Sequence, residues 1–317
     1  MRYILYGIDE LSIQAAHFFG VNNIECFFWP LSNVEEIESI PVRTEDKELI
    51  HYVKNCNVVI TCSNVKQIAL AVEKMCRLNI EYNLFGEAAS SIIEKEAEVY
   101  NKLNKRPEFS YDPIRKRFYA RDRVSQAGSV NHYFWQDLWA AKHIFYNKPE
   151  VHYDIGSRVD GFIANLLSFG QKVNLIDVRP LDARIPGLSF TCADATELNE
   201  IEDESIRSLS ALCSLEHFGL GRYGDTIDPE ACFKCFDAIQ RKVAIGGDIY
   251  IAVPVGRQGV EFNAHRVFYA ETIIKEFSKC HLVEFSIDYG THIEYDTSLH
   301  RLDDAKDYEF GLFYFRR

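Results

Sequence analysis

The chain has 317 residues, enough for two domains that each bury a core of their own. Its composition is that of an ordinary globular protein, with 47% apolar and 26% charged residues, and its formal net charge is −12. This acidic balance disfavours nucleic acid as the main partner, because phosphate binding needs a basic face. One local exception, at residues 114–123, has five basic residues with aromatic residues between them. We interpret that stretch as a solvated surface.

The cysteines and the apolar runs indicate the cellular compartment. Nine cysteines form an odd count, and without a signal peptide they indicate reduced thiols in a cytoplasmic protein. Cys232 and Cys235 stand in a predicted helix with no second pair, so we interpret them as packed thiols and predict no metal site. No apolar run approaches the length of a membrane span, so we expect a soluble protein with no integral membrane segment.

Residues 1–92 alternate between strand-like and helix-like patterns, which predicts a small Rossmann-like α/β domain. The expected strands are residues 2–7, 24–28, 57–62 and 80–85, and the expected helices are 10–19 and 65–78. The dinucleotide fingerprint is missing, because the residues directly after Gly7, 8–12, include no glycine, and Trp29-Pro30 stands where a carboxylate would end the second strand. We therefore expect an interaction or regulatory role for this domain.

Residues 93–130 are expected to form a bridge, made of a charged helix at 94–105 and an irregular stretch. This bridge leads to a second α/β domain, residues 131–317. In that domain the expected helices are 131–146, 158–169, 229–243 and 268–278, and the expected strands are 151–155, 172–178, 188–192, 205–215, 248–255, 282–289 and 308–316. No helical pattern separates the last two strands, so we expect an antiparallel pair at the end of a seven-stranded, mostly parallel sheet. We expect a Gly246-Gly247 turn before the fifth strand.

The first βαβ unit of this domain, residues 151–178, carries the features of a nucleoside site. Asp154 and Gly156 lie where its first strand turns, so the backbone there can approach a ligand closely. Asp177 closes its second strand, where an acidic side chain can accept both hydroxyls of a ribose. The structural alternative is a βαβ unit whose glycine only serves the turn.

These residues resemble a known family. Asp154-Ile-Gly-Ser157, Asp177, Ala193-Asp194-Ala195 and the Gly-Gly turn resemble class I S-adenosylmethionine-dependent methyltransferases, as does the expected strand order. The blocks 154–161, 216–225 and 262–268 resemble the family called domain of unknown function 268, which is associated with bacterial surface-polysaccharide gene sets. The methyltransferase loop usually has two glycines, and Arg158 takes the second position here.

The resemblance implies S-adenosylmethionine as the cofactor and a sugar or glycan as the substrate. It implies that the backbone around Asp154, Gly156 and Ser157 holds the methionine part of the cofactor. It further implies that Asp177 binds the ribose, and that Asp194, beside Ala195, binds the adenine amino group. For each side chain the structural alternative is a turn or helix cap.

The densest polar cluster, residues 215–225, follows the fourth strand at the expected ligand edge. Methyl transfer to a hydroxyl needs an aligned acceptor and a base, and histidine titrates near the working pH. His217 is therefore the first candidate base, with Glu216 or Asp225 to orient it; the alternative is polar surface. Arg222 and Tyr223 complete the predicted acceptor side of this loop.

The segment 262–268 is expected to begin the next helix and to reach the same edge. His265 is the second candidate base, and Asn263 and Arg266 are candidate substrate-binding residues. Arg266 suits a planar carboxylate or a phosphate on the acceptor. The alternatives are helix capping by Asn263 and a surface ion pair for Arg266. Glu216, His217 and Asp225 are all types of metal ligand, but no ligand spacing demands a metal.

Taken together, the sequence predicts an S-adenosylmethionine-dependent O-methyltransferase that acts on a sugar or surface-glycan precursor, with its N-terminal domain unassigned. A homo-oligomer is compatible with this interpretation. One alternative is a nicotinamide-dependent enzyme that modifies sugar nucleotides. The other is a non-catalytic scaffold with a relict cofactor fold.

Overall fold

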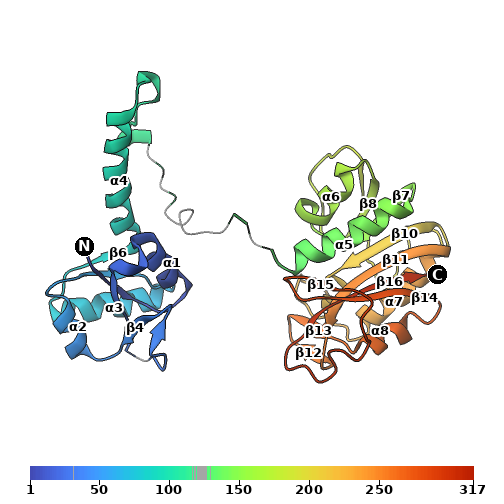
Figure 1. Ribbon diagram of the computed structural model, residues 1–317. Helices are drawn as coiled ribbons and strands as arrows, with labels where there is room; N and C mark the ends of the chain where they lie inside the picture. Colours follow the sequence, from blue (N-terminus) through green and yellow to red (C-terminus); the bar gives the residue numbers. More distant parts are fainter. Residues whose placement is uncertain (31, 116, 118, 120–126, 129) are drawn as a thin grey trace. The chain divides into compact units, whose positions relative to one another are not determined.

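The computed structural model describes residues 1–30, 32–115, 117, 119, 127–128 and 130–317 (Figure 1). The chain divides into two compact units, Met1–Ser129 and Val130–Arg317, and each is described by itself. Six positions of the basic stretch, namely 116, 118 and 120–123, lie outside the described residues. Within the described ranges, no helix is both long enough and apolar enough to cross a membrane.

The first unit is a six-stranded α/β sheet with the strand order β3-β4-β2-β1-β5-β6. Its elements are β1 (Tyr3–Tyr6), α1 (Glu10–Phe19), β2 (Ile24–Phe28), β3 (Glu36–Ile37), β4 (Ile40–Arg43), α2 (Asp46–Tyr52), β5 (Asn57–Ile60), α3 (Val65–Leu78), β6 (Tyr82–Leu84) and α4 (Phe85–Leu103). The sequence analysis missed β3, β4 and α2, because these short segments carry few apolar residues in either period. It also began the charged helix late, since α4 starts directly after β6.

The second unit is an eight-stranded sheet with the strand order β15-β14-β16-β11-β10-β7-β8-β9. Its elements are α5 (His132–Asn147), β7 (Val151–Ile155), η5 (Val159–Ile163), α6 (Ala164–Ser168), β8 (Lys172–Asp177), β9 (Leu188–Cys192), β10 (Ile206–Leu212), η6 (Leu215–His217), α7 (Ala231–Lys242), β11 (Val243–Val255), β12 (Gly259–Glu261), β13 (His265–Val267), α8 (Ala270–Glu276), β14 (His281–Asp288), β15 (Ile293–Glu294) and β16 (Glu309–Arg316). β16 runs antiparallel to both β11 and β14, which confirms the expected antiparallel pair.

Four predictions for the second unit are wrong in detail. The sheet gains an eighth, two-residue strand, β15. The helix expected at 158–169 is a π-helical turn, η5, followed by the short α6, because Gly161 adopts non-helical backbone angles. The Gly246-Gly247 pair lies inside β11 instead of before it. The segment 262–268 forms the turn and second strand of a hairpin, β12–β13, and the next helix begins only at Ala270.

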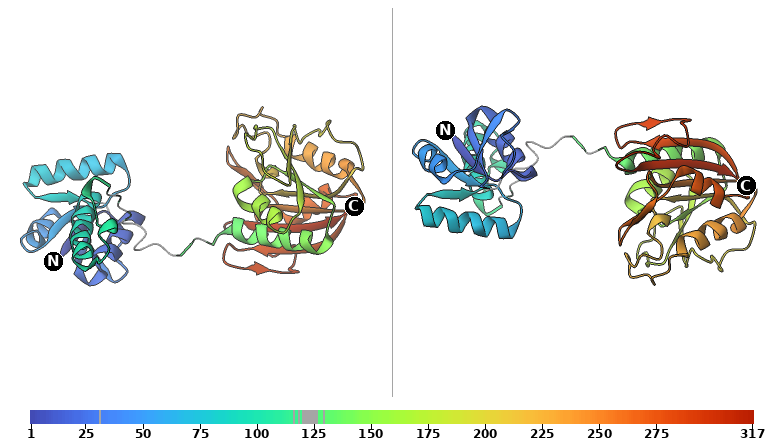
Figure 2. Two further views of the ribbon diagram at one scale, coloured as in Figure 1. Left: turned by 90° about the horizontal axis from the view of Figure 1, so that it is seen from above. Right: turned by 90° about the horizontal axis from the view of Figure 1, so that it is seen from below.

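Both faces of the second sheet are covered by helices (Figures 1 and 2). Along β11, Ile249 and Ile251 pack with the residues of α7 and α8, whereas Tyr250 and Ala252 pack with those of α5 and α6. This alternation follows from the two-residue period of a strand. Because both faces are buried, the carboxyl-terminal edge of the parallel strands is the part of the sheet that is open to a ligand.

Candidate functional site

A cavity of about 430 Å³ lies at the carboxyl ends of β7, β8, β9 and β10. Each of these strands contributes the residues that directly follow it. The lining includes Gly156 after β7, Asp177, Val178 and Arg179 at the end of β8, Asp194 and Ala195 after β9, and Ser214, His217, Phe218, Tyr223 and Asp225 after β10. The structure therefore brings the expected nucleoside residues and the expected base to one cavity.

The turn after β7 packs closely against Ser214, which follows β10. Gly156 has a φ of +80°, and a Cβ at this position would lie 2.9 Å from the Ser214 Cβ. Ser214 in turn donates a hydrogen bond of 2.8 Å from its Oγ to the Ile155 carbonyl oxygen. Glycine is thus required here both by backbone conformation and by the close approach of two strand ends.

Asp154 stabilises this turn through hydrogen bonds and does not line the cavity. Its carboxylate is fully buried and accepts hydrogen bonds from the Ser157 backbone N–H at 3.0 Å, the Ser157 hydroxyl at 2.9 Å and the Ser210 hydroxyl. Burial raises the pKa of Asp154 to about 6. The side chains of Asp154 and Ser157 therefore satisfy each other, and the loop can offer a ligand only its backbone.

His152, a buried histidine that was not predicted as a site residue, extends the hydrogen bonds of Asp154 and Ser210. The two ring nitrogens of His152 lie 2.8 Å from the hydroxyls of Ser208 and Ser210. Because the single Ser210 proton goes to Asp154, His152 must donate from Nε2 and accept the Ser208 proton at Nδ1. Burial lowers the pKa of His152 to about 3, which agrees with this neutral form.

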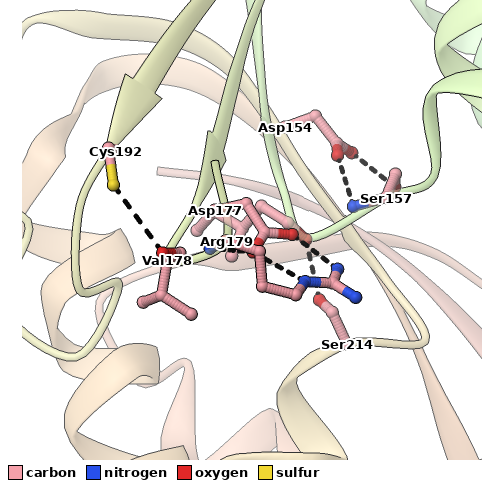
Figure 3. A network of polar contacts seen from close by, with 8 residues as sticks. Asp154, Ser157, Asp177, Val178, Arg179, Cys192 and Ser214 are labelled. Carbon is pink, nitrogen blue, oxygen red and sulfur yellow. Dashed lines mark hydrogen bonds and ion pairs between the residues drawn. The ribbon is translucent and has the colours of Figure 1, made fainter. Parts of the chain in front are cut away.

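Asp177 ends β8, as predicted, but its carboxylate already has a partner (Figure 3). Arg179 lies two residues further on, and its Nε and one terminal nitrogen donate to the two Asp177 oxygens at 3.0 and 2.6 Å. The Arg179 backbone N–H donates to the same carboxylate at 2.8 Å. The sequence analysis missed Arg179, although the Asp-x-Arg spacing was a usable signal.

Asp194 follows β9 and lines the cavity between the buried side chains of Ala193 and Ala195. Its Oδ1 accepts hydrogen bonds from the Thr196 backbone N–H at 2.9 Å and from the Thr196 hydroxyl at 2.7 Å. One carboxylate oxygen therefore serves the turn, as the structural alternative expected. Its place in the lining still puts Asp194 beside any ligand in the cavity.

Asp225 organises the loop 215–225 from within. Its carboxylate accepts hydrogen bonds from the backbone N–H groups of Gly219, Gly221 and Tyr223 at 2.8, 3.2 and 3.1 Å. Burial alone would raise the pKa of Asp225, but these amide contacts hold it below its usual range. Asp225 therefore shapes the loop, and these hydrogen bonds are to the backbone and not to His217. It also lines the cavity, so its contact with a substrate stays a prediction.

His217 presents an unprotonated nitrogen to the cavity side of this loop. Its Nδ1 lies 2.6 Å from the carbonyl oxygen of Ala264, which can only accept, so Nδ1 carries the proton and Nε2 does not. Burial, together with the positive charges of Arg222 and His265, lowers the pKa of His217 to about 4, although the Ala264 contact opposes this shift. The group that orients His217 is a main-chain carbonyl from the neighbouring hairpin.

Glu216 is the buried neighbour of that nitrogen. Its Oε1 lies 3.5 Å from Nε2 of His217, and its Oε2 has no hydrogen-bond partner among the described residues. Burial raises the pKa of Glu216 to about 8. The Glu216 carboxyl group is therefore protonated at neutral pH. It lies close to Nε2 of His217, the nitrogen that would accept a proton.

The structure contradicts one substrate-binding prediction from the segment 262–268, that for Arg266, and leaves that for Asn263 a prediction. Arg266 is buried, and its guanidinium donates to the carbonyl oxygens of Glu216, Phe218 and Pro229 at 3.3, 2.6 and 3.1 Å, so it anchors the loop and is closed to a substrate. Asn263 lies exposed in the hairpin turn, away from the lining of the cavity, and caps no helix. His265 remains near the site, with its ring 6.4 Å from that of His217.

Two arginines converge on one aromatic ring at the exposed side of the cavity. The guanidinium carbons of Arg179 and Arg222 lie 5.0 and 5.5 Å from the centroid of the Tyr223 ring. Tyr223 belongs to the cavity lining and is half exposed, and its ring lies 5.8 Å from that of His217. Tyr223 and Arg179 thus line the cavity, and Arg222 lies beside the Tyr223 ring; the substrate-binding role of Arg222 and Tyr223 stays a prediction.

A metal is not called for by the geometry. Within the part of the chain that the structure describes, no group of three or more His, Cys, Asp or Glu side chains could hold a metal ion. Cys232 and Cys235 are buried in the core beside α7 residues such as Phe236. Their role as packed thiols is confirmed by this placement.

A family model described as "Caenorhabditis protein of unknown function, DUF268" matches residues 193–301. That range holds the loop 215–225 and the segment 262–268, so the family resemblance is confirmed for this part of the chain. The block at 154–161 lies outside the match. None of the curated proteins matches the chain.

Solved structures with a similar arrangement share little sequence with this chain. A 1,6-didemethyltoxoflavin-N1-methyltransferase of Burkholderia thailandensis, solved with S-adenosylhomocysteine, is 14% identical over 57% of this chain and 78% of its own, with a TM-score of 0.40. The [4+2]-cyclase SpnF is 14% identical over 62% and 82%, with a TM-score of 0.42. A putative sarcosine dimethylglycine methyltransferase from Galdieria sulphuraria is 12% identical over 57% and 84%, with a TM-score of 0.41. Because these sequence identities and TM-scores are low, the function is argued from the residues of this chain.

Proposed function

We propose that the second unit is an S-adenosylmethionine-dependent methyltransferase. One observation carries the proposal: Gly156, Asp177, Asp194 and His217 line a single cavity at the carboxyl edge of the sheet. The cavity, at about 430 Å³, lies within the usual size range of small-molecule sites. When bound, S-adenosylmethionine supplies a methyl group on a sulfonium, which is electrophilic.

The residues present fit the parts of such a cofactor. At Gly156 the lack of a side chain leaves room for the methionine part against the backbone. Asp177 has two oxygens that suit two ribose hydroxyls, once Arg179 has left them. Val178 and Phe218 provide apolar walls, and Asp194 provides an acceptor for an adenine amino group.

His217 would act as the base for a hydroxyl acceptor. Nε2 of His217 would take the proton that the acceptor hydroxyl gives up as its oxygen receives the methyl group. The Ala264 carbonyl fixes the ring by holding Nδ1–H at 2.6 Å. Oε1 of Glu216, 3.5 Å away, can then accept a hydrogen bond from the new Nε2–H of His217. His265 is the second candidate base.

The finer part of the proposal concerns the acceptor. We propose an oxygen of a sugar or of a related surface-glycan precursor, in a cytoplasmic reaction. Its support is the family resemblance in the blocks 216–225 and 262–268, together with a polar, half-exposed rim of Arg179, Arg222 and Tyr223 that suits a polyhydroxylated molecule.

Titration calorimetry with S-adenosylhomocysteine tests the cofactor. We expect Asp177→Ala to weaken binding by about tenfold, because a bidentate, charge-assisted contact is lost. Asp303→Ala is the control, since Asp303 pairs with His300 away from the cavity. The proposal is wrong if the wild-type chain does not bind, or if the two variants bind alike.

Transfer from labelled S-adenosylmethionine to a panel of nucleotide sugars and sugar acids tests the chemistry. His217→Ala should bind S-adenosylhomocysteine as wild type does and lose methyl transfer by about a hundredfold or more, the usual contribution of a general base. If His217→Ala keeps full activity while His265→Ala loses it, the base has been assigned to the wrong histidine.

The nicotinamide alternative is disfavoured by a contact in the first unit. The Asp9 carboxylate caps the N-terminus of α1, where it accepts from the Ser12 backbone N–H at 3.1 Å and from the Ser63 backbone N–H at 2.7 Å. A pyrophosphate would have to replace this negative charge at the helix N-terminus. The scaffold alternative predicts that neither cofactor binds, and the same calorimetry with NAD and S-adenosylhomocysteine separates all three.

A further inference from the structure

We infer that Arg179 and Arg222, stacked at Tyr223, form a binding site for an anionic group of the acceptor, and that cofactor binding completes this site by releasing Arg179 from Asp177. The inference rests on the proposed function and adds the charge class of the substrate to it. The anionic group would be a carboxylate or a phosphate, as in a sugar acid, a sugar phosphate or a nucleotide sugar.

The first step concerns the position of Arg179. Both oxygens of Asp177 accept hydrogen bonds from its guanidinium, at 3.0 and 2.6 Å (Figure 3). A ribose held by the same carboxylate must therefore displace the guanidinium. The displaced side chain stays beside Tyr223, since its guanidinium carbon already lies 5.0 Å from the centre of that ring. Cofactor binding would thus leave a positive charge without its counterion on the cavity wall.

The second step concerns the position of Arg222. Among the residues that the structure describes, Arg222 forms no ion pair; it donates to the Ala264 carbonyl oxygen at 3.1 Å and lies 3.3 Å from Nδ1 of His217. Because that Nδ1 already holds a proton for the same carbonyl, its contact with the guanidinium is between two donors. The positive charge of Arg222 is therefore not balanced by a paired carboxylate among the described residues.

The third step concerns the geometry of the two arginines together. Both guanidinium groups stack on the Tyr223 ring, which lies 5.8 Å from the ring of the proposed base. Planar guanidinium groups bind carboxylates and phosphates through paired hydrogen bonds. An anion held here would place the rest of a sugar-sized molecule against His217. In a chain with a net charge of −12, such a local positive site also selects against neutral competitors.

The inference predicts positive coupling between cofactor and anion. The cofactor breaks the ion pair between Arg179 and Asp177, which makes Arg179 available to the anion. The anion neutralises the released Arg179, which lowers the free-energy cost of breaking that pair. By thermodynamic reciprocity, an anion must strengthen cofactor binding by the same factor by which the cofactor strengthens anion binding. A measurement with S-adenosylhomocysteine therefore reports on the anion site before the acceptor is known.

The test is calorimetric titration of the full-length chain with S-adenosylhomocysteine, with and without inorganic phosphate at constant ionic strength. We expect phosphate to lower the wild-type Kd by about fivefold or more. Arg222→Gln and Arg179→Gln should abolish this effect, and Arg179→Gln alone should bind at least as tightly as wild type because nothing competes for Asp177. Arg301→Gln is the control, since Arg301 forms an exposed ion pair with Glu294 away from the cavity. Circular dichroism verifies that each variant is folded.

The outcomes separate this inference from the proposed function. If the wild-type chain binds S-adenosylhomocysteine but phosphate has no effect, or if Arg301→Gln loses the effect as Arg222→Gln does, the inference is wrong and the proposed function stands. If only Arg179→Gln binds, Arg179 blocks the site and the inference is overturned. If neither wild type nor Arg179→Gln binds, the proposed function itself fails.

Discussion

Gly156→Ala should destabilise the second unit more than its backbone angle alone explains. Gly156 has φ +80°, and a new Cβ would lie 2.9 Å from the Cβ of Ser214. Gly170 offers a matched control, because it has φ +84° and nothing within 4 Å of the position of a Cβ. A left-handed alanine costs about 1–2 kcal/mol at either site. Forcing the Ser214 contact apart should add about 1–3 kcal/mol at Gly156 only.

Urea unfolding of the full chain, followed by tryptophan fluorescence, measures both costs. Trp135 and Trp139, two of the three tryptophans, lie in α5 of the second unit and report on it. Ser214→Gly alone should cost about 1 kcal/mol through its lost hydrogen bond to the Ile155 carbonyl. The double variant Gly156→Ala/Ser214→Gly should then cost less than the sum of the singles. Equal costs for Gly156→Ala and Gly170→Ala, or strict additivity, would refute the reasoning.

Two further predictions concern the loop 215–225. Burial raises the pKa of Glu216 to about 8, above its unfolded value, so the stability that its protonated form contributes is present at acid pH and is lost as the pH rises through 8. Glu216→Gln should therefore raise the free energy of unfolding relative to wild type more at pH 9 than at pH 5; a constant difference in urea titrations would contradict this. Arg266→Lys should cost about 2 kcal/mol, because one ammonium nitrogen cannot replace the two guanidinium nitrogens that reach the three carbonyls, and should speed proteolysis of the loop. Arg158→Lys, on the exposed surface, should change neither quantity.

The sequence predicted the elements whose signals are local. The bounds of β7 and β9 were predicted to the residue, because each is a short run bounded by turn residues. The antiparallel β16 was predicted from the lack of a helix before it. By contrast, the hairpin β12–β13 was taken for the start of a helix. Its pairing, such as Val260 opposite Arg266, depends on contacts between strands that no local period reveals.

The candidate site was predicted by position more than by role. Asp177, Asp194, His217 and Tyr223 all line the cavity, since residues at the carboxyl ends of neighbouring parallel strands must meet at one edge. Roles failed where a side chain turned inward, as Arg266 does toward three main-chain carbonyls. Nothing in a sequence tells a buried arginine that satisfies a loop from an exposed one that meets a substrate.

The polar chain beneath the turn after β7 has a consequence for how the sheet assembles. His152 reaches Ser208 and Ser210, and Ser210 reaches Asp154, only because Ser210 lies opposite Asp154 in the pairing of β10 with β7. A slip of one residue would turn these side chains to the opposite face and leave buried donors and acceptors unmatched. Apolar neighbours such as Leu209 and Ala211 would tolerate that slip far better. The chain of polar groups therefore favours the native register of β10 on β7 over one-residue slips, which the apolar contacts alone would discriminate less.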